Sequence, residues 1–178
     1  SDQSPGTADD TASADPAGAI PDDFPLASGM GGAHDTIATS RSGTGLRDLT
    51  LCRTSPLRGL GLRDRLVADN SGGESANTRE LVLMGSSEEA VLVARAFTEL
   101  PQGCQDPEGS GDVETVTEVR ESPFGPGPAA TLVQTYTVDR VPGDGATVIH
   151  VVPSGAAVLV TSTYGQWTAD EIEAGVDS

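Results

Sequence analysis

The stretch R-E-L-V-L-M-G-S-S-E-E-A-V-L-V-A-R-A-F-T-E-L-P-Q-G-C, residues 79–104, carries the strongest structural signals in the chain. The apolar run at 81–84 is typical of a buried strand. Ser86 is followed three residues later by Glu89, the spacing of a capping box, in which each side chain bonds the other residue's free backbone N–H. A helix is therefore predicted to begin at or just after Ser86 and to end at Pro101.

The predicted helix has apolar residues at three- and four-residue spacing, which is typical of a helix with one buried face. The predicted buried residues are Ala90, Val93, Ala94, Phe97 and Leu100. Glu88 and Glu89 fall in the first turn, where the helix dipole favours negative charge. Cys104 follows the helix, so a crosslink there would fix the helix end to the segment that carries the other cysteine.

Composition limits the classes of function. A chain of 178 residues fits one domain of ordinary size. The net charge of -17 argues against binding to nucleic acid or to an anionic membrane surface, because both attract basic surfaces. All the basic residues are arginine, and Ala, Gly and Asp are abundant, which indicates a GC-rich coding sequence and predicts an actinobacterial source. No motif for a cofactor is present, so none is predicted.

Cys52 and Cys104 are too far apart for a C-x-x-C metal or redox motif. In an exported protein the pair is interpreted as one disulfide, and its loop of roughly fifty residues would stabilise the fold by about 4 kcal/mol. The alternative is a cytosolic protein with two buried free thiols. No apolar run is long enough to span a membrane and no signal peptide is visible. We therefore expect any membrane attachment to come through an anchor outside these residues.

Residues 1–20 are acidic and nearly free of large apolar side chains, so we predict a disordered linker. Such a linker could separate a membrane or lipid anchor from a folded domain, and the alternative is a disordered tail with no anchor. Residues 21–178 are predicted to form a single domain. From Ile20 the sequence I-P-D-D-F-P-L-A-S-G-M is apolar between prolines and glycines, which suits an extended arm held by Phe24, Leu26 and Met30.

The predicted fold class is α+β, with a largely antiparallel sheet and two helices. Strands are expected at 46–52, 63–68, 79–84, 113–121, 130–141, 146–152 and 156–163, with a polar loop after Cys104. A second capping box, Thr168 with Glu171, predicts the second helix. Strands followed by a capped helix in each half suggest a loose internal duplication.

One spacing resembles a metal site. Oxygen-bearing side chains alternate in D-P-E-G-S-G-D-V as in the first part of a calcium loop, at Asp106, Glu108, Ser110 and Asp112. The twelfth position is Thr117 rather than the bidentate Glu that such a loop needs. We therefore favour an acidic surface loop and keep calcium as a weak candidate.

No catalytic residue is predicted. The chain has no G-x-S-x-G motif and no phosphate-binding loop, and its only histidines are His34 and His150. His34 is interpreted as a solvated loop residue, and His150 as a structural residue in a strand. Tyr164 and Trp167 are a candidate ligand or partner surface, and the alternative is that they close the core at a helix entrance.

Four segments carry a resemblance to known proteins: P-G-T-A-D, I-P-D-D-F-P-L-A, E-E-A-V-L-V-A-R-A-F and A-A-V-L-V-T-S-T-Y-G. In texture they resemble exported single-domain lipoproteins of actinobacteria and, more distantly, the extracellular sensor domains of their receptor kinases. The resemblance implies an antiparallel sheet with helices and a cleft, stabilised by disulfides and without catalytic residues. Those sensor domains tend to have more than two cysteines, so no site residue is transferred.

The sequence thus predicts a noncatalytic extracytoplasmic domain that binds or senses an unknown small molecule, lipid or envelope protein. Two alternatives stay open. One is a structural or protein-interaction module without a pocket, and the other is a secreted hydrolase that uses paired carboxylates. A cleft with an aromatic lining would favour binding over the interaction module.

Overall fold

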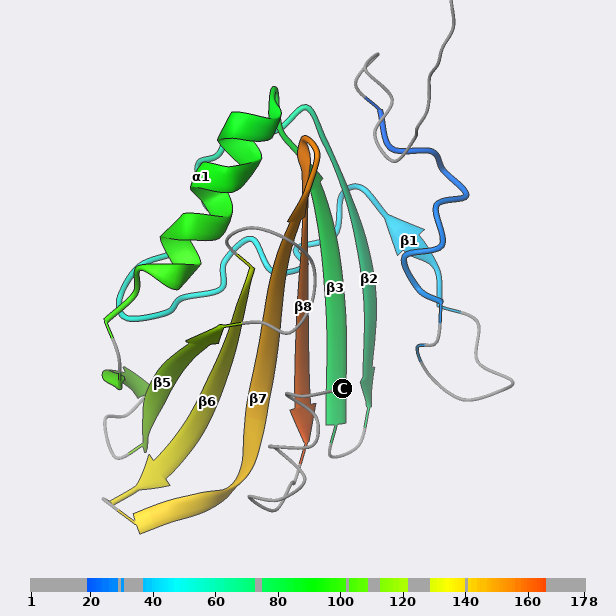
Figure 1. Cartoon of the computed structure of the whole chain (residues 1–178). Coiled ribbons are helices and arrows are strands. Elements are labelled where there is room, and N and C mark those ends of the chain that lie inside the picture. The colour runs from blue at the N-terminus through cyan, green and yellow to red at the C-terminus, as the bar shows by residue number, and fades with distance from the viewer. Residues whose placement is uncertain are drawn as a thin grey trace, which may run out of the picture.

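The computed structural model describes residues 19–28, 30, 37–72, 75–101, 103–108, 113–121, 129–139 and 141–165. These residues form one antiparallel sheet of eight strands with a helix on one face (Figure 1). The elements are β1 (Thr39–Ser40), β2 (Asp64–Gly72), β3 (Ser75–Leu83), α1 (Ser87–Thr98), β4 (Cys104–Glu108), β5 (Val113–Glu121), β6 (Ala130–Val138), β7 (Val141–Ser154) and β8 (Ala157–Gly165).

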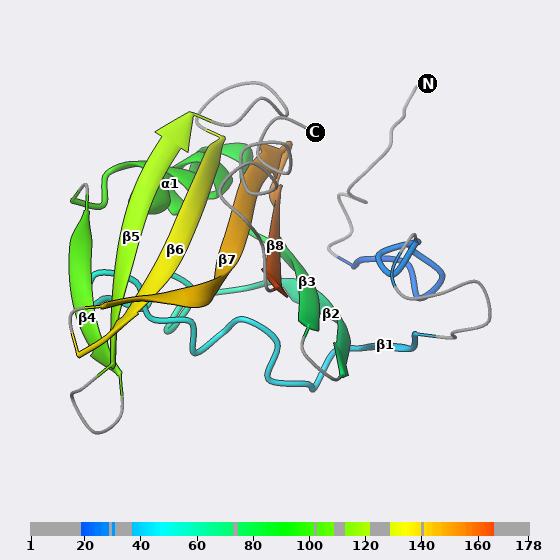
Figure 2. The same cartoon turned by 90° about the horizontal axis from the view of Figure 1, so that it is seen from below.

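The strand order is β1-β2-β3-β8-β7-β6-β5-β4, and every neighbouring pair is antiparallel. Strands β4 to β8 follow one another as a meander, and β8 then pairs with β3. Helix α1 connects β3 to β4, which lies at the far edge of the sheet. Figure 2 shows this order from below, from β4 on one side to β2 and β1 on the other.

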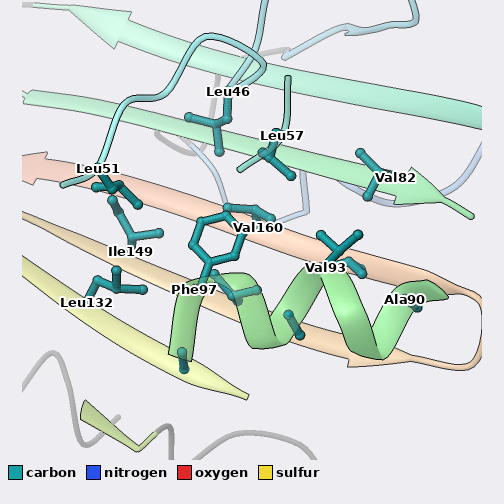
Figure 3. Packing of buried hydrophobic residues seen from close by; sticks show 14 of the residues in the cluster. Leu46, Leu51, Leu57, Val82, Ala90, Val93, Phe97, Leu132, Ile149 and Val160 are labelled. Atoms are coloured by element: carbon teal, nitrogen blue, oxygen red, sulfur yellow. The ribbon is translucent and has the colours of Figure 1, made fainter. Parts of the chain in front are cut away.

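Helix α1 packs on the half of the sheet formed by β5 to β8. Its buried residues are Ala90, Val93, Ala94 and Phe97, as the periodicity predicts, and Leu100 packs against the same core. The core residues from the strands include Val82, Leu132, Ile149 and Val160 (Figure 3), together with Val151 and Val158. The predicted start of the helix and its buried residues from Ala90 to Phe97 are confirmed, whereas the helix ends at Thr98 and the partly buried Leu100 follows it.

Ser86 caps the helix, and its Oγ accepts a hydrogen bond from the backbone N–H of Glu89 at 3.2 Å. Replacing Ser86 by alanine should lower the free energy of unfolding by about 1 kcal/mol, because one N–H of the first turn loses its partner. Urea denaturation measures the difference. Ser87→Ala, the same change one residue later at an exposed position, is the control, and an equal loss in both variants would contradict the capping role.

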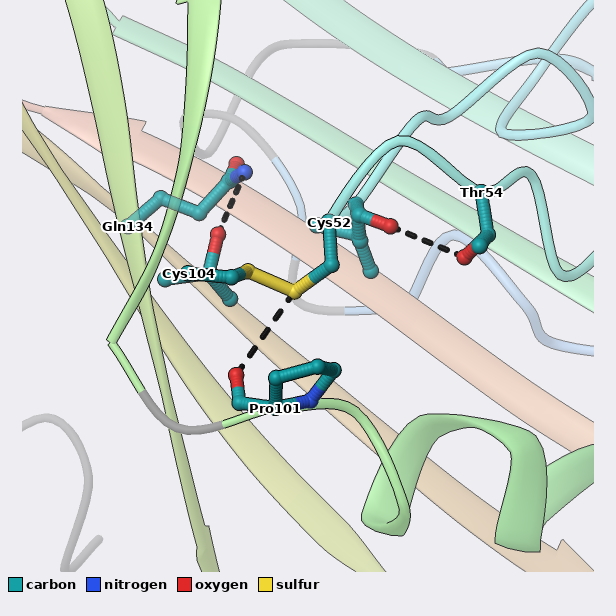
Figure 4. Close-up of a disulfide and its surroundings, with 7 residues drawn as sticks. Cys52, Thr54, Pro101, Cys104 and Gln134 are labelled. Atoms are coloured by element: carbon teal, nitrogen blue, oxygen red, sulfur yellow. Dashed lines mark hydrogen bonds between the residues drawn. A yellow bond between two sulfur atoms is a disulfide. The ribbon is translucent and has the colours of Figure 1, made fainter.

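The segment between β1 and β2 crosses the helix side of the sheet. Leu46, Leu51 and Leu57 join the core beside Phe97 (Figure 3). The disulfide between Cys52 and Cys104 joins this segment to the start of β4, with the two Cα atoms 5.5 Å apart (Figure 4). The predicted disulfide is confirmed.

The disulfide lies beside a buried polar pair. Thr117 is the cross-strand partner of Cys104, and Thr117 Oγ1 accepts a hydrogen bond from Gln134 Nε2 at 3.3 Å (Figure 4). Cys52 Sγ lies 3.7 Å from the carbonyl oxygen of Pro101. The crosslink therefore connects the loop, the end of the helix segment and the outer strands at one place.

The strand predicted at 46–52 is wrong, because this segment forms turns. Leu51 and Thr54 exchange two backbone hydrogen bonds, at 2.7 and 2.9 Å, around Cys52 and Arg53. Both central residues have positive φ, 52° and 65°, as in the tight two-residue turns of hairpins. Leucines of the segment are buried because the loop folds onto the core, and not because they alternate along a strand.

The polar loop predicted after Cys104 is also wrong at 104–108, where the chain forms β4. This strand pairs with β5 in register, from Cys104 opposite Thr117 to Glu108 opposite Val113. Polar residues can form such an edge strand because its backbone hydrogen bonds come from the partner strand.

The predicted α+β class with two helices and a loose duplication is wrong: the fold is mainly β. The sheet is continuous across both halves of the sequence, because β3 of the first half pairs with β8 at the end of the second. Helix α1 has no counterpart in the second half among the residues the structure describes. The helix predicted from Thr168 lies outside them. No helix in the described ranges is long and apolar enough to span a membrane.

A buried ion pair holds the segment between β1 and β2, residues 41–63, which we call the crossing loop. Glu80 on β3 is only 1% exposed, and its carboxylate accepts hydrogen bonds from Arg65 Nε at 3.0 Å and from the backbone N–H of Leu46 at 2.7 Å. The guanidinium of Arg65 also donates to backbone carbonyls of the loop. Gly45 has a φ of 56°, and a Cβ there would lie 2.5 Å from Glu80 Oε1. Glycine is therefore required for this close approach.

Replacing Glu80 by glutamine should lower the free energy of unfolding by about 2 kcal/mol, the range of a hydrogen bond to a charged group. The amide keeps an acceptor but loses the charge that faces Arg65. Glu118→Gln is the control, because its pair with Arg120 is 3.4 Å long and exposed, and such pairs contribute less than about 1 kcal/mol. Equal losses in the two variants would show that the buried pair contributes no more than an exposed one.

Candidate ligand-binding site

The N-terminal arm, residues 19–28 and 30, lies on the face of the sheet opposite α1. Val82 packs in the core under the helix, whereas its neighbours Leu81 and Leu83 pack with the arm. Successive residues of a strand point to opposite faces, so the two cores lie on the two sides of the sheet. In Figure 1 the arm is drawn in blue, and β2 lies between it and the helix.

Apolar side chains hold the arm against β2, β3 and β8. The buried residues of the arm are Ile20, Leu26 and Met30, and Phe24 is partly buried. Two of the three predicted contacts, Leu26 and Met30, are therefore buried. The third, Phe24, is partly buried and packs against the same cluster. The predicted limits of linker and domain are not tested by these contacts and stay predictions.

Charged side chains also hold the arm, among them Arg41, whose guanidinium donates to the carbonyl oxygen of Ile20 and to Asp22 Oδ1. Arg79 Nη1 on β3 donates to the carbonyl oxygens of Leu26, at 3.0 Å, and Ser28, at 2.6 Å. Asp64 at the start of β2 accepts a hydrogen bond from the backbone N–H of Ile20 at 2.7 Å. The arm is thus fixed at both ends of its described length.

Partial burial tends to raise the pKa of Asp64, but hydrogen bonds from the backbone of Ile20, the side chain of Arg41 and the backbone of Arg65 outweigh it, so its pKa lies below the usual range. A lowered folded-state pKa means that the stabilising contribution is full above the unfolded-state pKa, about 3.9. It is lost as the pH falls through the folded-state pKa. At neutral pH this contact of the arm is intact.

A cavity of about 540 Å³ lies between the arm and the sheet. This volume is in the usual range of small-molecule sites, roughly 300–1,000 Å³. The described lining comes from the arm and from three adjacent strands: Phe24, Pro25 and Leu26; Asn77, Arg79 and Leu81 of β3; Ala157, Leu159, Thr161 and Thr163 of β8; and His150, Val152 and Ser154 of β7.

The strand register divides the floor of the cavity into a polar and an apolar part. Three rows cross the sheet: Asn77 with Thr163; Arg79 with Thr161 and His150; and Leu81 with Leu159 and Val152. The first two rows carry polar side chains and the third is apolar. A bound molecule would therefore meet hydrogen-bonding groups toward one end of the floor and hydrocarbon toward the other.

Three polar side chains set the chemistry of the cavity. The Oδ1 atom of Asn77 is buried and has no hydrogen-bond partner among the described residues. His150 Nδ1 lies 2.9 Å from Thr131 Oγ1, and burial lowers the pKa of His150, so that the ring is neutral at neutral pH. Arg79 contributes a positive charge, and no described member of the lining is Asp or Glu.

The structure describes only Tyr164 of the sequence-predicted aromatic pair. Tyr164 lies on β8, where its ring packs edge-on against Tyr136 with centroids 6.1 Å apart. A Cβ on Gly145 would lie 2.7 Å from the Tyr164 hydroxyl, so glycine makes room for the ring. Tyr164 does not line the cavity between arm and sheet. Trp167 lies outside the described residues, so a ligand or partner surface at the pair stays a prediction.

The structure describes only two of the four residues of the weak calcium candidate. Asp106 and Glu108 belong to β4, and Ser110 and Asp112 lie outside the described residues, as does His34. No group of three or more His, Cys, Asp or Glu in the described ranges is placed to hold a metal ion. The calcium candidate is therefore untested.

The resemblance implies a cleft, but sequence reasoning does not locate the cavity or name its lining residues. His150 was expected to be a structural residue of a strand, and its bond to Thr131 agrees with that, but its place in the cavity wall was not predicted. A weak signal was present: Asn77, Arg79 and Leu81 alternate along one strand, from polar through charged to apolar. Only the strand pairing shows that Thr161 and His150 lie beside Arg79 in one row across the sheet.

Comparison with known proteins finds similarity at the level of fold. No family model matches the chain, and no curated protein matches it. A match among solved structures is the extracellular domain of PknH from Mycobacterium tuberculosis, with a TM-score of 0.51 and 14% sequence identity. The match covers 80% of this chain and 77% of that chain. The fold is similar to that of the PknH extracellular domain.

PknH is a mycobacterial receptor kinase, so the resemblance to receptor-kinase sensor domains is supported at the level of the fold. At 14% identity the similarity to PknH carries no residue role from one protein to the other. The lipoprotein nature and the actinobacterial source stay predictions.

Proposed function

We propose that this chain is a noncatalytic extracytoplasmic domain that binds or senses a small molecule in the cavity between the arm and the sheet. The observation that carries the proposal is the cavity itself, about 540 Å³ with a polar and an apolar part. Such a combination of apolar walls with a few convergent polar groups is typical of ligand sites.

The proposed location outside the cytoplasm has two supports. The disulfide between Cys52 and Cys104 belongs to a class of bond that persists mainly in oxidising compartments. The fold is similar to that of a domain that is extracellular in PknH. Attachment as a lipoprotein or through another membrane anchor belongs to the proposal, with the acidic residues that precede the arm as the linker.

The cavity favours binding over the two alternatives. A hydrolase with paired carboxylates needs two acids that face each other in a cleft, and the described lining contributes no Asp or Glu. An interaction module without a pocket does not account for the cavity between the arm and the sheet.

A native mass spectrum of the protein isolated from the envelope of its own host tests the proposal. We expect a discrete additional mass that is lost on denaturation, and that mass would identify the chemical class of the ligand. A bare chain mass in repeated preparations, with no mass gained on exposure to an envelope extract, would contradict binding and favour the interaction module.

A further inference from the structure

We propose that the cavity binds an amphipathic molecule, with a carboxylate or phosphate head group at Arg79 and a hydrocarbon chain over the row formed by Leu81, Leu159 and Val152. The inference rests on the proposed binding function and specifies the class of ligand.

The charge of the lining differs from that of the chain. The sequence has 27 acidic and 10 basic residues, yet the described lining holds one arginine and no acid. Among the described residues no carboxylate pairs with Arg79, which bonds only the carbonyl oxygens of Leu26 and Ser28. A positive charge without an acidic partner in such a chain is complementary to an anionic ligand.

The geometry of Arg79 suits a charged head group. Both bonds to the arm use Nη1, so they fix the guanidinium while its other N–H groups have no partner in the described part of the chain. These groups can donate paired, charge-assisted hydrogen bonds to a carboxylate or phosphate. His150, in the same row, is neutral and can accept or donate without adding a second charge.

Asn77 adds a second polar contact. It lies two residues before Arg79 on the same face of β3, and its buried Oδ1 has no partner among the residues described. An unsatisfied buried acceptor costs about 1–3 kcal/mol. A ligand hydroxyl or amide N–H beside the anionic group would satisfy it.

The apolar part of the cavity suits a hydrocarbon chain. Leu81, Leu159 and Val152 form its floor, and Phe24 of the arm lies at its wall. Each buried methylene contributes about 0.8 kcal/mol. A head group alone should therefore bind much more weakly than the same head group with a chain.

Nitrogen-15 NMR titration of the whole chain tests the inference with defined probes: decanoate, monodecyl phosphate, decan-1-ol and acetate, all below their aggregation limits. We expect decanoate or monodecyl phosphate to shift backbone amides of residues 77–81, 150–154 and 157–163. The alcohol and acetate should each bind at least about tenfold more weakly, since one lacks the charge and the other the chain.

Three variants separate the effect of the Arg79 charge on binding from the effect of the hydrogen bonds that Arg79 makes to the arm. Arg79→Gln should weaken binding of the anionic probe about tenfold or more, and Arg79→Lys should lose clearly less, because it keeps the charge although it loses the paired hydrogen bonds. Arg58→Gln removes the same charge at an exposed loop position and should leave binding unchanged. Equal losses in Arg79→Gln and Arg79→Lys would assign the effect to the arm contacts and overturn the role of charge.

The outcomes distinguish this inference from the proposed function. If decan-1-ol binds the cavity as tightly as decanoate, the anionic head group is wrong and the binding function stands. If no probe shifts the cavity amides although native mass spectrometry finds a bound mass, the amphipathic class is wrong. If both measurements find nothing, the inference and the function fail together.

Discussion

Replacing Cys52 and Cys104 together by serine is expected to lower the free energy of unfolding by about 4 kcal/mol. The disulfide closes a loop with a sequence separation of 52 residues, and opening it returns that loop entropy to the unfolded chain. The native state loses a constraint as well, because the disulfide joins the crossing loop to the start of β4. Urea denaturation of the oxidised and doubly substituted proteins measures the loss.

Two comparisons control this result. The oxidised protein treated with a reductant should match the double variant, because both lack the same bond. A Cys52→Ala/Cys104→Ala variant should lose a similar amount, which would exclude an effect of the new hydroxyl groups. A loss below about 1 kcal/mol in both double variants would contradict this, and would show that the leucines and the Glu80–Arg65 pair hold the loop without the disulfide.

Replacing Phe97 by alanine should lower the free energy of unfolding by about 3–5 kcal/mol. Phe97 is the largest fully buried side chain among the residues that the structure describes, and it lies where α1, the sheet and the crossing loop meet (Figure 3). Truncation removes the apolar contacts of the ring and leaves a cavity that three separate segments line. The same denaturation experiment gives the loss.

Leu92→Ala is the matched control, because Leu92 lies on the same helix and is 65% exposed. It should change the free energy of unfolding by less than about 0.5 kcal/mol. If Phe97→Ala costs no more than Leu92→Ala, α1 is not packed on the sheet as described.

Local signals predicted the elements that local chemistry determines. The Ser86–Glu89 spacing located the start of α1, and its periodicity identified the buried face. The strand predicted at 113–121 is β5, and β6, β7 and β8 each overlap their predicted ranges. Alternating β-branched residues and glycine- or proline-rich turns are sufficient for such a meander.

The features that sequence reasoning missed depend on contacts between distant residues. The segment 46–52 has the pattern of a strand, but Leu46 and Leu51 are buried by Phe97 and the sheet and form no ladder. Strand β4 is polar and exists through its pairing with β5. The fold class was wrong because the pairing of β3 with β8 joins both halves into one sheet.

The candidate site could not be predicted from the sequence for the same reason. The arm was predicted from its composition, and its apolar residues were named, but nothing in the sequence placed it on the face opposite the helix. Arg79, Thr161 and His150 form one row only through the registers of two strand pairs. Site residues on different strands cannot be grouped before those registers are known.

The central claim is that the cavity between arm and sheet holds a ligand. The most direct test is native mass spectrometry of three proteins from the same envelope: wild type, Thr161→Trp, which fills the middle of the cavity floor, and Thr50→Trp at an exposed loop position. We predict a bound mass on wild type and Thr50→Trp, and a bare chain for Thr161→Trp with its thermal unfolding still cooperative. The same bound mass on all three proteins would contradict the account, because the ligand would then lie elsewhere.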